Sequence, residues 1–160
     1  MKSKVQPHDP GVKVIAANRR AFHDYFILDK LEVGIALVGS ELRPCREGKV
    51  NLKDAFADED NGQLWLHDAN IGSNPFSNRL DHNPIRKRRL LAHRKEIIKI
   101  GQKIKTTGIT LIPLKFYFRK GKVKVELALV KGKTQYDKRE TIAKKDFKRE
   151  MDREMAGKGR

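Results

Sequence analysis

Histidine and cysteine side chains most often carry catalysis or bind metal ions, and this chain offers few of them. Cys45 is the only cysteine, which excludes an intramolecular disulfide and any multi-cysteine zinc site and fits a reducing compartment. No glycine-rich phosphate loop and no serine or cysteine nucleophile motif is present. We therefore expect no enzyme activity, no cofactor and no metal ion. The histidines are scattered without metal-ligand spacing, at His8, His23, His67, His82 and His93.

The chain is strongly basic. Lys and Arg total 36 against 20 Asp and Glu, which gives a formal net charge of +16. Such a balance suits a polyanionic partner. An anionic membrane is one polyanion, but no apolar run approaches the roughly 20 residues that span a bilayer, and no basic amphipathic helix carries Trp or Phe opposite its charges. Nucleic acid is therefore the expected partner, and no membrane is expected.

Basic and aromatic side chains that would contact RNA occur at two places. Residues 86–89 read RKRR and would bind phosphates, although such a run is as often a solvated face. Tyr117 lies between Lys115 and Lys124 by alternation across a predicted hairpin, where it would stack on an unpaired base. The alternative for Tyr117 is a rim aromatic packed against lysine stems.

The elements that must position these side chains are mostly strands. Apolar alternation from residue 25 to residue 38 places Val33 and Ile35 on one side and Glu32 and Gly34 on the other. Asn61-Gly62 is a strong hairpin signal within an acidic turn. Further strands are predicted over residues 12–17, 53–57 and 63–71, and a second hairpin over residues 112–129.

Two helices and a loop complete the ordered part. Ser40 is expected to cap a short helix that runs to Glu47. A near-3.6-residue apolar period predicts the longest helix over residues 88–105, with Leu91 on its apolar stripe. Residues 72–87 contain glycine and prolines with few regular apolar positions, so a long surface loop is expected there.

These elements predict one domain with a tail. Residues 1–11 are polar, lack the apolar core of a secretory signal and are expected to be a flexible leader of a cytoplasmic protein. Residues 12–131 are expected to form a mainly β fold with flanking α-helices, a small antiparallel β-barrel of the oligonucleotide-binding (OB) type, although periodicity alone does not separate it from other small barrels. Residues 132–160 form a basic tail, expected to be disordered in isolation and helical when bound.

Several segments resemble the SsrA-binding protein family, in unbroken order over about residues 12–150. The N-terminal half contributes 18–27 (NRRAFHDYFI), 41–43 (ELR), 46–51 (REGKVN) and Asp54. The C-terminal half contributes 89–91 (RLL), 111–115 (LIPLK), 122–127 (KVKVEL), 131–133 (KGK) and 136–140 (YDKRE). Pro44-Cys45 and the loop 73–83 depart from the family pattern.

The resemblance implies a ribosome-rescue factor that binds the tRNA-like domain of transfer-messenger RNA (SsrA) and delivers it to stalled ribosomes for trans-translation. Its tail is implied to enter the empty mRNA channel near the decoding centre. Elongation factor Tu would be a partner only indirectly, through the charged RNA, and a monomer is expected. The resemblance implies that Asn18, Glu32, Leu91 and Lys124 contact transfer-messenger RNA, and Arg19, Lys115 and Tyr117 are further candidates for this contact. The implied contacts of the tail with the ribosome, including small-subunit ribosomal RNA, are made by Lys131, Lys133, Tyr136, Asp137, Lys138 and Arg139.

Two other functions fit the same composition. An OB-type structural ribosomal protein that binds ribosomal RNA would show the same charge and the same basic tail. An OB-type accessory to a nuclease or ligase is a weaker alternative. For Glu32, the alternative to RNA contact is an exposed strand residue paired with a neighbouring lysine.

Overall fold

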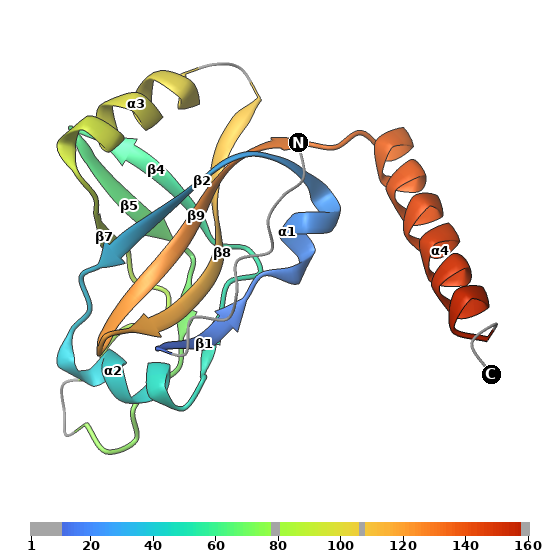
Figure 1. Cartoon of the computed structure of the whole chain (residues 1–160). Helices are drawn as coiled ribbons and strands as arrows, with labels where there is room; N and C mark the ends of the chain where they lie inside the picture. Colours follow the sequence, from blue (N-terminus) through green and yellow to red (C-terminus); the bar gives the residue numbers. More distant parts are fainter. Residues whose placement is uncertain (1–10, 78–80, 106–107, 158–160) are drawn as a thin grey trace.

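The computed structural model describes residues 11–77, 81–105 and 108–157 (Figure 1). Its helices are α1 (Arg19–Asp24), α2 (Gly39–Arg46), α3 (Arg94–Ile104) and α4 (Gln135–Gly157). The first strands are β1 (Val12–Ala17), β2 (Tyr25–Ile35), β3 (Val50–Asn51), β4 (Phe56–Asp60) and β5 (Gln63–His67). The remaining strands are β6 (Asn70–Ile71), β7 (Arg88–Leu91), β8 (Ile109–Arg119) and β9 (Lys122–Gly132).

Antiparallel strands form a closed ring. The order within the described residues is β8-β4-β5-β7-β2-β9, and pairing of β8 with β9 closes it, while β1 joins outside on β8. Inward-facing apolar side chains fill the interior, among them Leu64, Phe116 and Leu127. Figure 1 shows α3 at one end of this barrel and α2 at the other. The predicted small antiparallel barrel with flanking helices is confirmed.

Both predicted hairpins are present, and their turns explain their registers. Asn61 and Gly62 have φ values of 51° and 73°, and Lys120 and Gly121 have values of 50° and 73°. Two consecutive left-handed residues are typical of the turn that matches the twist of paired strands.

Two strands differ in their bounds from the prediction. The strand predicted over residues 53–57 runs from Phe56 to Asp60, so the acidic residues before the turn belong to β4. The run 63–71 is divided into β5 and β6, with Asp68 at a φ of 54°.

The helix predicted over residues 88–105 is wrong in its first third. Residues 88–91 form β7, which pairs with β5 on one side and β2 on the other, and α3 begins only at Arg94. The two neighbouring strands offer backbone groups that a helix at this position would leave unpaired inside the barrel. Leu90 is buried opposite Leu64 and Ile35, so Leu91 points to the other face.

The short helix α2 is confirmed with a different cap. It begins after Val38, whose N–H donates to the Glu41 carboxylate over 2.9 Å. Ser40 lies inside the helix, and its hydroxyl contacts Nδ1 of His82 at 3.0 Å. The side chains of α2 therefore connect this helix to the loop that precedes β7.

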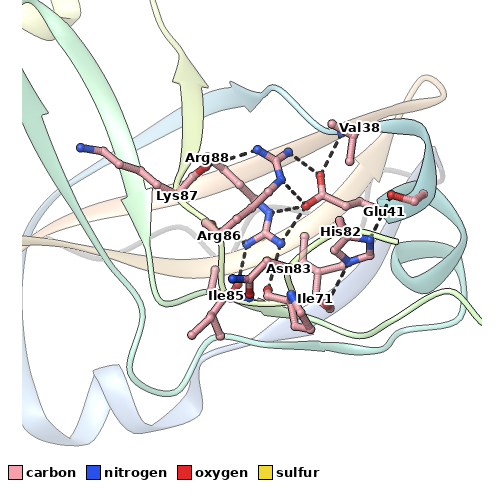
Figure 2. Close-up of polar contacts among 12 residues, drawn as sticks. Val38, Glu41, Ile71, His82, Asn83, Ile85, Arg86, Lys87 and Arg88 are labelled. Carbon is pink, nitrogen blue, oxygen red and sulfur yellow. Dashed lines mark hydrogen bonds and ion pairs between the residues drawn. The ribbon is translucent and has the colours of Figure 1, made fainter. Parts of the chain in front are cut away.

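A buried ionic cluster centres on that glutamate (Figure 2). The Glu41 carboxylate accepts hydrogen bonds from Nε (2.8 Å) and Nη2 (2.7 Å) of Arg86 and from Nε (2.8 Å) of Arg88. Arg88 is fully buried as well and donates to the carbonyls of Ala69 and Pro84. The cluster ties α2, the segment before β7 and the strand β7 itself to one carboxylate. The hypothesis that all of residues 86–89 bind phosphates is therefore wrong, because the side chains of Arg86 and Arg88 bind within the protein itself.

Glu41→Gln should destabilise the fold strongly, because it leaves two arginines without their anion. We expect the free energy of unfolding to fall by about 3–5 kcal/mol in urea titrations at neutral pH. Burial alone would raise the pKa of Glu41, but hydrogen bonds from Arg86 and Val38 and the charge of Arg88 hold it below its ordinary value. A lowered folded pKa stabilises the protein above the unfolded pKa, and this stabilisation is lost as pH falls through the folded pKa.

The difference between Glu41→Gln and wild type should therefore shrink in acid. Glu47→Gln is the matched control, since Glu47 forms exposed pairs with Arg43 and Lys49 and should change stability little. An equal loss in both variants would contradict the role given to the buried cluster.

Candidate nucleic-acid interface

Three residues implicated by the resemblance meet at one groove. Glu32 on β2, Leu91 on β7 and Lys124 on β9 line it together with Gly34, Gln63, Arg89, His93 and Ile97. Because β2 lies between β7 and β9 in the sheet, three separate stretches of sequence place their outward-facing side chains side by side. Leu91 is half exposed, which leaves an apolar surface beside charged groups.

Gly34 forms the floor of this groove. Its Cα partners are Leu91 on β7 and Lys124 on β9, so it lies between these two side chains. A Cβ at this position would come within 3.2 Å of the Leu91 Cβ. A side chain at this position would therefore crowd Leu91. The signal in the sequence was a glycine inside a strand, which often marks a close approach of a ligand or another backbone.

Three side chains fix the orientation of the Glu32 carboxylate. The hydroxyl of Tyr117 donates to Oε2 in a short hydrogen bond, and Nη1 of Arg119 donates to the same oxygen over 2.9 Å. Nζ of Lys124 lies 3.9 Å from Oε1, so Lys124 neutralises the carboxylate without a close hydrogen bond. The Tyr117 bond, followed by Arg119, lowers the pKa of Glu32 against the opposing effect of burial. Glu32 is therefore a fixed anion with one side open to solvent.

Tyr117 is not placed to stack on an RNA base. Its side chain is 7% exposed, so little of the ring is open to a base. Burial and the hydrogen bond to Glu32 raise the pKa of its hydroxyl. Lys115, two residues earlier on β8, lies 3.7 Å from Glu126, which also pairs with Lys30 at 3.2 Å. The outer face of β2, β8 and β9 thus carries two carboxylates, each flanked by cations.

Asn18 and Arg19 lie at the start of α1 and are not among the residues that line the groove. Asn18 is buried and caps α1 by accepting a hydrogen bond from the N–H of Ala21. Its amide donates to the carbonyl of Leu52 at 3.1 Å and lies 3.4 Å from that of Pro113. Asn18 therefore joins α1 to the barrel, and its side chain is fully used. Arg19 is exposed beside it.

The implicated residues of the tail lie around the start of α4. Lys131 is exposed at the end of β9, and Arg139 is exposed on α4. Lys133 and Lys138 contact α1, and the Asp137 carboxylate accepts from the Thr134 N–H at 3.1 Å and hydroxyl at 2.7 Å. Tyr136 belongs to the helix, but its side chain lies outside the described residues.

Features of a metal site, a membrane span or a reactive thiol are lacking in the part of the chain that the structure describes. No group of three or more His, Cys, Asp or Glu side chains is arranged to hold a metal ion in this part of the chain. Among the described helices, none combines the length and apolarity needed to cross a membrane. Cys45 is buried, and burial raises the pKa of its thiol to about 11, which makes it a poor nucleophile.

Comparisons with known proteins point to one family. The family model described as SmpB protein matches residues 15–157. An SsrA-binding protein of Moorella thermoacetica is 53% identical over 145 residues, which cover 90% of this chain and 94% of the relative. One from Desulfitobacterium hafniense is 47% identical over 150 residues, covering 94% and 96%.

A solved structure described as "tmRNA-SmpB: a journey to the center of the bacterial ribosome" has a TM-score of 0.65 and 40% identity to this chain. The match covers 79% of this chain and 93% of that one. The barrel fold is thus shared with that structure. On the family match and the extent of these identities, the chain belongs to the SmpB family of SsrA-binding proteins.

Proposed function

We propose that this protein is an RNA-binding ribosome-rescue factor. Its barrel binds the tRNA-like domain of transfer-messenger RNA, and the complex enters stalled ribosomes for trans-translation in the cytoplasm. The observation that carries the proposal is the groove between β7, β2 and β9, where Glu32, Leu91 and Lys124 meet in a member of the SmpB family. The same family membership disfavours a permanent structural ribosomal protein. The ribosome then carries out the chemical steps, and elongation factor Tu interacts with this protein only through the charged RNA.

The groove offers the three contacts that folded RNA requires. The Glu32 carboxylate accepts hydrogen bonds from 2′-hydroxyls or base amino groups, which distinguish RNA from a plain polyanion. Lys124 supplies a cation for a nearby phosphate. Leu91 packs against an exposed base or ribose. Gly34, which has no side chain, leaves the space that Leu91 occupies at the floor of the groove.

The tail has the properties of a segment that needs a partner. α4 has exposed apolar side chains along its length, so no protein surface buries them. Its pair from Glu140 to Lys144, at 2.6 Å, is exposed to solvent and adds little to helix stability. We propose that the tail beyond its first turns is disordered in the free protein and becomes helical in the empty mRNA channel near the decoding centre. The exposed apolar side chains are Ile142, Phe147, Met151 and Met155.

The deciding experiment is a gel-shift titration of the full chain against the tRNA-like domain of transfer-messenger RNA. Elongator tRNA serves as the competitor at physiological salt. Binding that survives the competitor supports the rescue factor. Equal binding to both RNAs would leave a generic basic RNA binder and would overturn the proposal.

Lys124→Met should weaken this binding about tenfold, which is ~1.4 kcal/mol, and should lower the slope of log affinity against log salt by about one. Lys122→Met is the control, because it removes the same charge two residues earlier on β9, at an exposed position. Glu32→Gln should weaken binding without lowering the salt slope. If Lys122→Met and Lys124→Met weaken binding equally, the groove is not the site.

Deletion from Asp137 onward should separate two activities. The groove lies wholly before this position, so affinity for transfer-messenger RNA should stay within about twofold of wild type. Peptide tagging on ribosomes programmed with truncated message should be lost, since the deletion removes Asp137, Lys138 and Arg139 with the rest of α4. A parallel loss of RNA binding would contradict this division of labour.

Tyr117→Phe tests how Glu32 is oriented. Removing the hydroxyl deletes the leading cause of the lowered Glu32 pKa, so this pKa should rise toward its ordinary value in an NMR titration of the carboxyl carbon. RNA affinity at neutral pH should fall several-fold, by about 1 kcal/mol, because one hydrogen bond no longer fixes the carboxylate. Tyr25→Phe is the matched control on the same barrel. An unchanged Glu32 pKa in Tyr117→Phe would contradict the assignment.

A further inference from the structure

The tail leaves the barrel at a corner formed by α1 and β2. β9 ends at Gly132, and only Lys133 and Thr134 separate it from α4. The N–H of Lys133 donates to the carbonyl of Asp24 at 3.0 Å, and its ammonium lies 3.3 Å from the carbonyl of Phe22. The same ammonium lies 5.0 Å from the ring centre of Phe26. The connection is therefore held at both backbone and side chain.

The carboxylate of Asp24 extends this attachment into α4. Nζ of Lys138, in the first turn of the helix, lies 3.3 Å from Oδ1. Within α1, Nδ1 of His23 and Nε of Arg20 each lie 2.9 Å from the same carboxylate. His23 first, and then Lys138 and Arg20, bring the pKa of Asp24 to about 2 against the effect of burial. Asp24 thus remains an anion under all physiological conditions.

The start of α4 is also braced internally. Thr134 and Asp137 cap each other, as described above, and the hydroxyl of Thr141 donates to the carbonyl of Asp137 at 2.8 Å. The ammonium of Lys133 lies 3.4 Å from that hydroxyl. Residues 133–141 therefore form one unit fastened to α1, whereas residues 142–155 are exposed throughout. Figure 1 shows α4 running from this corner away from the barrel.

The charges around this corner give Asp24 a particular weight. α1 reads RRAFHD, so Asp24 is its only acidic residue and stands beside Arg19, Arg20 and His23. The tail root, which comprises residues 133–141, brings further cations, Lys133 and Lys138. Without the carboxylate, α1 would offer the tail root mainly like charge, and the two would repel each other.

We propose that Asp24 is a positioning residue for the tail, which fixes the direction in which α4 leaves the barrel by holding Lys138. The inference deepens the proposed function and rests on it for its role in tagging: a barrel bound to RNA delivers the tail to a defined place only if the tail root has a defined orientation. Asp24 itself need not touch either RNA. Lys138 exchanges its carboxylate partner for ribosomal phosphate after the tail has been placed.

The direct test measures the tail root in the free, full-length protein. Spin labels at Lys122→Cys and Arg139→Cys, both exposed positions, report the distance between the barrel and the second turn of α4. Cys45 is buried and stays unlabelled. We expect a narrow distance distribution in the wild-type background and one at least twice as wide with Asp24→Asn. Asp24→Glu should restore the narrow distribution.

Asp146→Asn is the matched control, because it removes the same charge from α4, where Asp146 pairs only weakly with Arg149 at 3.8 Å. Its distribution should equal that of wild type. The pair Asp24→Lys with Lys138→Glu should narrow the distribution relative to Asp24→Lys alone. A wild-type distribution in Asp24→Asn, or equal broadening in Asp146→Asn, would overturn the proposal.

The functional test uses unlabelled proteins. Asp24→Asn should keep affinity for the tRNA-like domain within about twofold and reduce peptide tagging about tenfold, and Asp24→Glu should recover tagging. Equal loss of affinity and tagging, with a lowered melting temperature, would show general structural damage and overturn the positioning role. The distance measurement needs no RNA, so it decides the role of Asp24 at the tail root even if the gel shift rejects the proposed function.

Discussion

The register of β7 depends on one buried carboxylate. Glu41 holds Arg88 inside the protein, and alternation along a strand then obliges Arg89 and Leu91 to face outward. A slip of one residue would bury Leu91 and expose Arg88, which would leave Glu41 without its partner. The polar cluster at one end of the barrel thus determines which side chains reach the groove on the outer face. Burying such a cluster costs free energy of desolvation, but an alternative register would leave a buried charge without its partner, which costs far more free energy.

Three acidic residues play the same role at different places in this basic protein. Glu41, Glu32 and Asp24 each gather two or more cations, at the barrel end, at the groove and at the tail root. In each case the carboxylate gives direction to flexible arginine or lysine side chains that would otherwise repel each other. Net charge attracts RNA from a distance, whereas these few anions determine where the cations stand when it arrives.

Much of the fold could be predicted from periodicity. The alternation in β2, β8 and β9 and the turns at Asn61-Gly62 and Lys120-Gly121 follow local rules, and the structure confirms them. β7 could not be predicted in this way, because Arg-Arg-Leu-Leu fits a helix as well as a strand and the choice depends on two distant strands. The same limit affected Arg88, since no local signal distinguishes an arginine that binds phosphate from one that binds a buried glutamate.

The candidate site shows a similar division. The resemblance supplied Glu32, Leu91 and Lys124, and the sheet order explains why residues so far apart in sequence meet. Local reasoning placed Gly34 on the same strand face as Glu32 but did not predict that it forms the floor of the groove between two neighbouring strands. It also could not foresee that Asn18 and Tyr117 would be largely buried, since their partners at Leu52 and Glu32 come from other strands and loops.

The closure of the barrel has a consequence for how the protein is made. The ring is completed only when β2 pairs with β9, from Tyr25 opposite Gly132 to Gly34 opposite Lys124. These contacts join residues about a hundred positions apart, so they form late and cannot form on a chain still missing its C-terminal third. The groove is assembled by the same pairing. A nascent chain therefore acquires its groove only after β9 has emerged from the ribosome that is synthesising it, and a copy that ends before β9 has no groove at all.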